Sequence, residues 1–412
     1  MPTQSRDSAH FEDSTPYDLV ASDTAWHASG TGSESQTLYV VTNDGAIVLL
    51  QVAWAHVGLF PTIQVSMRYN GSGGVVAHRT VNCSTFNLAE DRRSVKTDAM
   101  NVTASQQASP KGSNAGATWE FKFGLSNSDA KHLRGSVVFE VVDRGYKVGP
   151  QGNVLLSQSN GDEAKFMSHR YFPFGKCRGE MVIENKTTVS LDGVGTFIHA
   201  HGGGVKPHSV APRWSLLVAS LPSAEVYSRQ TSSDEWTKSG DYNGNANAHL
   251  SLLRYITSKQ FGSEHISMGG FVWNGKLYSV TTQNTCDYLD TSFDKDTKYE
   301  VPAHVKYHLA GNTLPNVLPA NVIGDKEFAG PTATFEGDLT FDTNNKSLIA
   351  KVDVLAELPY LIRKVIQALI TRPFLYQHFN EVKPTVTLTD TDGSQIKLVL
   401  SGRAFHEQTY MD

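Results

Sequence analysis

The chain contains few cysteines. Only three occur among its 412 residues, Cys83, Cys177 and Cys286, and they lie far apart with no Cys-x-x-Cys spacing. An odd and sparse set of cysteines argues against a disulfide framework and is typical of a reducing compartment. We therefore expect an intracellular protein that is not secreted.

Long apolar stretches and basic runs are also absent. No segment approaches the roughly 18 consecutive apolar residues of a membrane span, and the first residues are polar, unlike a secretory signal peptide. The net charge is −5, and no cluster of Lys and Arg offsets it, which argues against nucleic acid as a partner. The share of charged residues, 19%, is that of a globular protein, and the length suggests about two domains.

Known catalytic and metal-binding motifs are missing as well. The nucleophile motif Gly-x-Ser-x-Gly does not occur, although His201-Gly-Gly-Gly204 matches the oxyanion-hole sequence of some lipases. We therefore exclude a hydrolase, predict no catalytic residues, and assign these glycines to a hinge or tight loop between two domains. His199 and His201 project to one face if the segment is a strand. No carboxylate or cysteine joins them at a recognised spacing, so we predict no metal site and no cofactor.

Strand patterns dominate the chain. Apolar and polar residues alternate over residues 62–68, as in a half-buried strand, and Asn43-Asp44-Gly45 and Asn274-Gly275 are tight hairpin turns. The other segments that read as strands are 37–41, 46–54, 119–123, 136–142, 213–220, 225–229, 248–255, 265–273, 276–280, 303–309, 332–342, 347–355 and 395–400. This pattern predicts an all-β fold of two tandem antiparallel barrels, each with roughly eight strands and room for a small ligand.

We expect three parts along the chain. Residues 1–36 are rich in Ser, Thr, Asp and Gly and read as a polar mobile arm, followed by an N-terminal barrel over 37–200 and a C-terminal barrel over 201–412. Residues 357–372 break the strand pattern, because apolar residues recur there at helical spacing, opposite basic residues, before Pro373. We predict an amphipathic helix packed across a barrel end, with a position on a membrane surface as the alternative.

Two segments in mid-chain have an unusual composition. They are Met167-Ser-His-Arg-Tyr-Phe-Pro-Phe-Gly-Lys-Cys177, and Gly204-Val-Lys-Pro-His208 with its continuation to Trp214. Both mix His, basic and aromatic residues around a proline, which suits neither a core nor a solvated loop and is typical of the rim of a ligand pocket. The alternative is that these side chains join the two barrels through hydrogen bonds and cation–π contacts. The candidate ligand-binding residues are His169, Arg170, Lys206, His208 and Trp214.

These two segments resemble the survival factor 1 family of fungal proteins. The resemblance continues in Glu357-Leu-Pro-Tyr-Leu-Ile-Arg-Lys, in Pro373-Phe-Leu-Tyr-Gln and in the final Thr409-Tyr-Met-Asp412, so it covers most of the chain. It implies two tandem lipocalin-like barrels that bind ceramide-type lipids and move them between endoplasmic reticulum and Golgi membranes, with a link to survival of oxidative stress. Family members typically begin with an apolar amphipathic helix that attaches them to membranes, whereas this chain begins with a polar sequence.

The resemblance implies a cytoplasmic lipid-binding or lipid-transfer protein, also found in the nucleus and at endoplasmic reticulum and Golgi membranes, and not an enzyme. Cofactor-independent hydratases and pericyclases are similar to tandem lipocalin-like proteins, so such an enzyme is the alternative, and Asp241 and Tyr242 mark one place for a catalytic carboxylate. A scaffold with filled barrels is a third possibility. Cys177, between Lys176 and Arg178, is either a redox-sensitive thiol with a lowered pKa or an inert strand-end cysteine.

Overall fold

The computed structural model describes residues 8–56, 60–71, 73–105, 115–125, 132–157, 165–244, 246–312, 314, 334–343, 347–353, 373–390 and 392–411. These residues form two antiparallel sheets, one from each half of the chain. The helical elements among them are short: η1 (Ala21–Thr24), α1 (Pro207–Val210) and η3 (Lys259–Phe261). The described chain contains no helix that is both long and apolar enough to span a membrane.

The N-terminal sheet has sixteen strands in the described residues, twice the number expected. They are β1 (His10–Phe11), β2 (Pro16–Asp18), β3 (Gly32–Thr42), β4 (Ile47–His56), β5 (Thr62–Asn70), β6 (Val76–Cys83), β7 (Asn87–Leu88), β8 (Val95–Lys96), β9 (Met100–Ser105), β10 (Thr118–Phe123), β11 (Leu133–Val141), β12 (Tyr146–Val148), β13 (Asn153–Ser157), β14 (Lys165–Ile183), β15 (Thr187–Ser190) and β16 (Gly193–Gly203).

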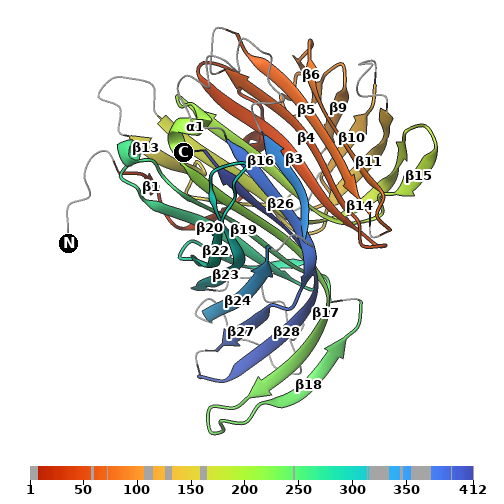
Figure 1. The fold of residues 1–412 in the computed structure, drawn as a ribbon. Coiled ribbons are helices and arrows are strands. Elements are labelled where there is room, and N and C mark those ends of the chain that lie inside the picture. The colour runs from red at the N-terminus through yellow and green to blue at the C-terminus, as the bar shows by residue number, and fades with distance from the viewer. Residues whose placement is uncertain are drawn as a thin grey trace.

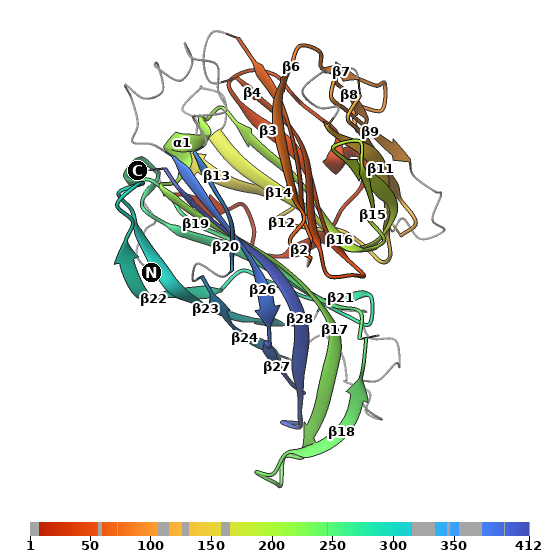
Figure 2. The same ribbon diagram turned by 45° about the vertical axis from the view of Figure 1, so that its right-hand side comes forward.

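The C-terminal sheet has twelve strands in the described residues. They are β17 (Arg213–Arg229), β18 (Thr237–Tyr242), β19 (Ala248–Ile256), β20 (His265–Trp273), β21 (Lys276–Thr281), β22 (Thr285–Phe293), β23 (Glu300–Asn312), β24 (Thr334–Asp342), β25 (Leu348–Asp353), β26 (Phe374–Val382), β27 (Thr385–Thr389) and β28 (Gln395–Tyr410). The long strands β17 and β28 pair with each other and, with β18, extend away from the N-terminal sheet (Figure 2).

The N-terminal sheet curls around its own core, which is filled. Its main strand order is β6-β5-β4-β3-β16-β14-β11-β10-β9-β8-β7, and side chains from distant strands meet on its inner face. The ring of Trp119 lies 4.9 Å from that of Phe197 and 4.7 Å from that of Phe172, measured between centroids. All three side chains are fully buried. The expected room for a ligand inside this half is therefore occupied by aromatic side chains.

The two sheets pack against each other through their outer faces. Because side chains alternate along a strand, β3 directs Leu38 into the N-terminal core and Tyr39 toward the C-terminal half. β17 likewise directs Leu217 into the C-terminal core and Val218 toward the N-terminal half. We call the apolar layer between the two halves the inter-sheet layer. In Figure 1 it lies where β16 and β3 approach β26 and β28.

Several expectations need correction. Residues 167–177 do not form a rim between strands, because they all lie within the 19-residue strand β14, which accommodates Pro173 at an irregularity in its pairing with β16. Residues 8–36 do not form a mobile arm: β1 pairs with β13, β2 pairs with β12, and Trp26 is fully buried. The N-terminal sheet continues to Gly203 and the C-terminal sheet begins at Arg213, so the two halves meet at residues 204–212. The helix expected over 357–372 lies outside the described residues.

Candidate functional site: a groove between the two sheets

A groove of about 380 Å³ opens at one end of the inter-sheet layer. Its walls come from both halves of the chain: β3, β4, β14 and β16 on one side, and β17, β19, β26 and β28 on the other. The volume falls within the roughly 300–1,000 Å³ of small-molecule sites. We call it the inter-sheet groove. The apolar residues of its wall include Met167, Ile198, Leu216, Leu253, Leu375 and Met411.

Two of the five candidate residues, His169 and Trp214, meet in this groove. Their ring centroids are 6.4 Å apart, and Trp214 also packs on Tyr255 at 4.4 Å. The Trp214 indole donates a hydrogen bond to the carbonyl of Ala211, which fixes the ring at the start of β17. Burial lowers the pKa of His169 to about 3, with the charge of Arg170 acting in the same direction. The imidazole is therefore neutral at physiological pH.

The other three candidates do not join them. Arg170 follows His169 on β14 and so points to the opposite face, where its guanidinium donates to Ser168 Oγ at 2.7 Å and to the Gln151 carbonyl at 3.4 Å. Lys206 is exposed just before α1. The side chain of His208 lies outside the described part of the structure. Alternation along a strand thus separates residues that are adjacent in the sequence.

The inner end of the groove carries polar groups that the sequence interpretation missed. Tyr171 lies two residues beyond His169 on the same face of β14, and Glu407 lines the groove from β28, close to Tyr39 and Arg68. Within the described residues, neither the Tyr171 hydroxyl nor His169 Nδ1 has a hydrogen-bond partner. Glu407 Oε2 accepts a hydrogen bond from Gln377 Nε2 at 2.6 Å. Burial raises the pKa of the Glu407 carboxyl, and the bond from Gln377 and the charge of the buried Arg68 guanidinium only partly oppose this.

Glu34, a buried carboxylate with three hydrogen-bond donors, is among the residues that line the groove. Its carboxylate accepts hydrogen bonds from the backbone N–H groups of His27 and Ala28, at 2.9 and 2.8 Å, and from His199 Nε2 at 2.8 Å. Burial raises the pKa of Glu34, but its hydrogen bonds from His199 and from the Ala28 N–H outweigh burial and hold the pKa below its usual range. Burial also lowers the pKa of His199. The pair is therefore a carboxylate bound by a neutral imidazole, and it fixes residues 26–28 against β3 and β16.

His199 and His201 do not form a metal site. No group of three or more His, Cys, Asp or Glu side chains in the described ranges is arranged to hold a metal ion. His201 stacks on His27 with ring centroids 4.8 Å apart, and burial lowers its pKa to about 4. Both histidines therefore have packing partners of their own.

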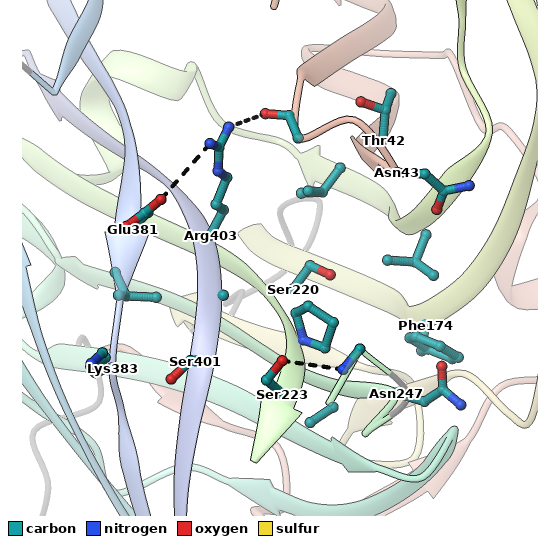
Figure 3. A pocket seen from close by; sticks show the side chains of 18 residues that line it. Thr42, Asn43, Phe174, Ser220, Ser223, Asn247, Glu381, Lys383, Ser401 and Arg403 are labelled. Atoms are coloured by element: carbon teal, nitrogen blue, oxygen red, sulfur yellow. Dashed lines mark hydrogen bonds and ion pairs between the residues drawn. The ribbon is translucent and has the colours of Figure 1, made fainter. Parts of the chain in front are cut away.

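A second hollow, of about 810 Å³, lies at the other end of the inter-sheet layer. We call it the polar crevice. Figure 3 shows the Arg403 side chain crossing it, where the guanidinium donates to the Gly45 carbonyl and lies 3.9 Å from the Glu381 carboxylate. Arg403 thus joins a hairpin turn of the N-terminal half to β28 of the C-terminal half. The charges and turn residues of this crevice suit solvent better than hydrocarbon.

Cys177, Asp241 and Tyr242, the other residues considered for a chemical role, do not have the surroundings that such a role needs. Cys177 is buried, and burial raises the pKa of its thiol, whereas Lys176 and Arg178 point to the opposite, exposed face of β14. A thiol in this setting is not the low-pKa thiolate of a redox sensor. Asp241 is exposed and forms an ion pair with Lys238 at 2.8 Å, while Tyr242 packs edge-on against Trp273. Glu407 is a groove carboxyl group with a raised pKa, close to the Tyr39 ring.

Comparison with known families gives a match over almost the whole chain. The model of the Svf1 family matches residues 2–412. The chain belongs to the Svf1 family. This family is the one that the two mid-chain segments and the C-terminal segments indicate, so that prediction is confirmed.

Relatives in the Svf1 family come from several fungi. The ceramide-binding protein SVF1 of Yarrowia lipolytica is 24% identical over 392 residues, which are 93% of this chain and 87% of that protein. The ceramide-binding protein svf1 of Aspergillus fumigatus is also 24% identical, over 94% and 83% of the two chains. The ceramide-binding protein svf-1 of Neurospora crassa is 23% identical over 100% and 94%.

Solved structures similar to this Svf1-family chain show its fold class. Kievitone hydratase from Nectria haematococca has a TM-score of 0.51 at 10% identity and covers 99% of this chain and 98% of its own. A putative AttH from Nitrosomonas europaea has a TM-score of 0.51 at 10% identity, with 94% and 95% coverage. At this identity the likeness concerns architecture alone. The predicted all-β, lipocalin-like fold is confirmed.

Proposed function

We propose that the protein binds a ceramide-type lipid in the inter-sheet groove and carries it without chemical change. The observation that carries the proposal is an apolar groove that contains two buried polar atoms, His169 Nδ1 and the Tyr171 hydroxyl, with no partner among the described residues. An unpaired buried polar atom costs roughly 1–3 kcal/mol. A ceramide offers an amide and hydroxyls that satisfy such atoms, and hydrocarbon chains that suit the walls. The names of the relatives as ceramide-binding proteins support the same ligand.

Lipid extraction tests this proposal directly. We expect lipid extracted from the purified protein to contain sphingolipid by mass spectrometry, and the emptied protein to take up ceramide from vesicles. A preparation that is free of sphingolipid and takes up no added ceramide contradicts the proposal.

Replacing Trp214 with alanine is expected to weaken ceramide binding by at least about 10-fold. The indole forms part of the groove wall. Contact between a large apolar side chain and the hydrocarbon of a ligand removes both from water and contributes about 1.5–3 kcal/mol. Titration of each variant with a tail-labelled fluorescent ceramide measures the effect. Trp236→Ala is the matched control, because Trp236 packs under Arg229 and Lys397 away from the groove. Equal losses in the two variants contradict the assignment.

The movement of lipid between membranes is part of the same proposal. We propose that the protein carries ceramide between endoplasmic reticulum and Golgi membranes from the cytoplasm, and that survival of oxidative stress depends on this transport. Transfer of a labelled ceramide between two vesicle populations tests the first step. A rate equal to that without protein contradicts it.

One observation favours a catalytic alternative. Glu407 combines a raised pKa with a position beside aromatic rings in the groove, an arrangement typical of a general acid. Incubation of the protein with ceramide, followed by mass spectrometry, distinguishes the two functions. Unchanged ceramide supports binding alone, whereas a product that forms with the native protein and is lost in Glu407→Gln, with ceramide uptake retained, supports an enzyme.

A further inference from the structure

The inter-sheet groove has an outer and an inner end, and strand registers define them. On β14, residues Met167, His169 and Tyr171 follow one another on the groove face from outside inward. On the opposite wall, Trp214 pairs with Thr409 at the outer end, and Leu216 pairs with Glu407 further in. Trp214 and Met411 are partly exposed, whereas Tyr171 is fully buried. The C-terminus and α1 lie close together at the outer end (Figure 1).

The strongest polar groups of the groove lie on its inner walls. At the outer end the wall is formed mostly by Met167, Trp214, Leu375 and Met411, together with the small hydroxyl side chains of Ser33 and Thr409. The inner positions carry the Glu407 carboxyl and the unpartnered Tyr171 hydroxyl, with Gln51 held by its hydrogen bond to Thr37 at 2.8 Å. His169 lies between these two levels.

Aromatic rings close the inner end. The Tyr39 ring lies 5.3 Å from that of Phe405, which is fully buried, and Tyr171 stacks on Tyr146 with ring centroids 5.1 Å apart and an interplanar angle of 10°. The polar crevice begins on the far side of these rings, with Val41, Phe174 and Arg403 in its wall. A ligand that reaches Glu407 and Tyr171 therefore meets a closed wall.

We infer that the lipid enters polar end first, so that its amide and hydroxyls contact Glu407, Tyr171 and His169 while its hydrocarbon chains lie along the apolar outer walls beside Trp214. The inference rests on the proposed function and adds the orientation of the ligand and its selectivity. A closed polar end accommodates the amide and the two free hydroxyls of a ceramide. It leaves no space for a sugar or phosphocholine attached to the primary hydroxyl. The site is thus specific for sphingolipids without a bulky headgroup.

Labelled lipids test the orientation. We expect a ceramide with a fluorophore at the end of its acyl chain to bind, and one with the fluorophore on its primary hydroxyl to bind at least about 10-fold more weakly. Unlabelled sphingomyelin and glucosylceramide of the same chain length are expected to compete at least about 10-fold less well than ceramide. Equal binding of both probes, or equal competition, overturns the inference. Failure of every ceramide to bind instead overturns the proposed function.

Two tyrosine variants test whether Tyr171 contacts the polar end of the lipid. Tyr171→Phe removes one hydroxyl from the inner end and is expected to weaken ceramide binding about 3- to 10-fold. Tyr278→Phe is the matched control, because its hydroxyl is also buried without a partner among the described residues but lies in the C-terminal core and does not line the groove. Circular dichroism establishes that both variants fold. An unchanged affinity in Tyr171→Phe, or an equal loss in Tyr278→Phe, contradicts the assignment.

Discussion

Replacing Glu34 with alanine is expected to lower the free energy of unfolding by about 3–5 kcal/mol, because a buried carboxylate with three donors is lost. The N–H groups of His27 and Ala28 and the imidazole of His199 all donate to this carboxylate. Without it these donors remain buried, and each unsatisfied group costs roughly 1–3 kcal/mol. Such a loss is a large share of the stability of a typical domain, about 5–15 kcal/mol.

Denaturant unfolding followed by tryptophan fluorescence measures this loss. Glu184→Ala is the control, since Glu184 is half exposed and forms surface ion pairs with Arg79 and His132, and surface pairs contribute little. Glu34→Gln keeps one acceptor oxygen and is expected to fall between the wild type and Glu34→Ala. A Glu34→Ala protein as stable as Glu184→Ala would show that the buried carboxylate contributes nothing.

Acidification is expected to unfold the protein between about pH 6.5 and pH 4. Burial lowers the pKa of His169 to about 3, and those of His201 and His249 to about 4, from an unfolded value of 6.5. In this window the unfolded chain binds protons that the folded chain does not, so stability is complete above pH 6.5 and falls as the pH falls. Between pH 6.5 and pH 4 each of these histidines removes about 3 kcal/mol of stability, and three such groups together match the total stability of a domain.

His249→Leu tests the acid prediction at one position. His249 lies in the inter-sheet layer with its ring 5.3 Å from that of Phe174. Its replacement removes one proton-binding group from the unfolded state, so we expect the variant to be more stable than the wild type at pH 5 by about 2 kcal/mol relative to their difference at pH 7.5. Half-exposed His132, replaced with glutamine, is the control. A pH dependence identical in all three proteins refutes the prediction.

The fold class followed from the sequence because alternation and turn residues are local signals. Asn43-Asp44-Gly45 and Asn274-Gly275 predict hairpins, and the structure places Gly45, Asn274 and Gly275 in positive-φ conformations between paired strands. Strand length was harder to predict. The predicted strand 395–400 is only the first part of β28, which continues to Tyr410. Its extension carries His406 and Glu407, polar residues that local propensity does not assign to a buried strand.

The site was only partly predictable for a related reason. Aromatic and imidazole groups near a proline predict His169 and Trp214 as pocket residues, and the structure brings the two together across the inter-sheet groove. Arg170 was grouped with them because the segment was interpreted as a pocket rim, whereas alternation within β14 places its side chain on the opposite face. Glu407 and Tyr171 come together only when two sheets pack through their outer faces. That contact depends on long-range packing, for which the sequence contains no local signal.

The division of the groove wall between the two halves of the chain has a thermodynamic consequence. Because Tyr171 belongs to one sheet and Glu407 to the other, a bound lipid is a third component of the interface between them. The bound lipid then stabilises the association of the two halves. A change that weakens this association favours release of the lipid. Severing the chain within residues 204–212 should leave two fragments, neither of which retains lipid alone.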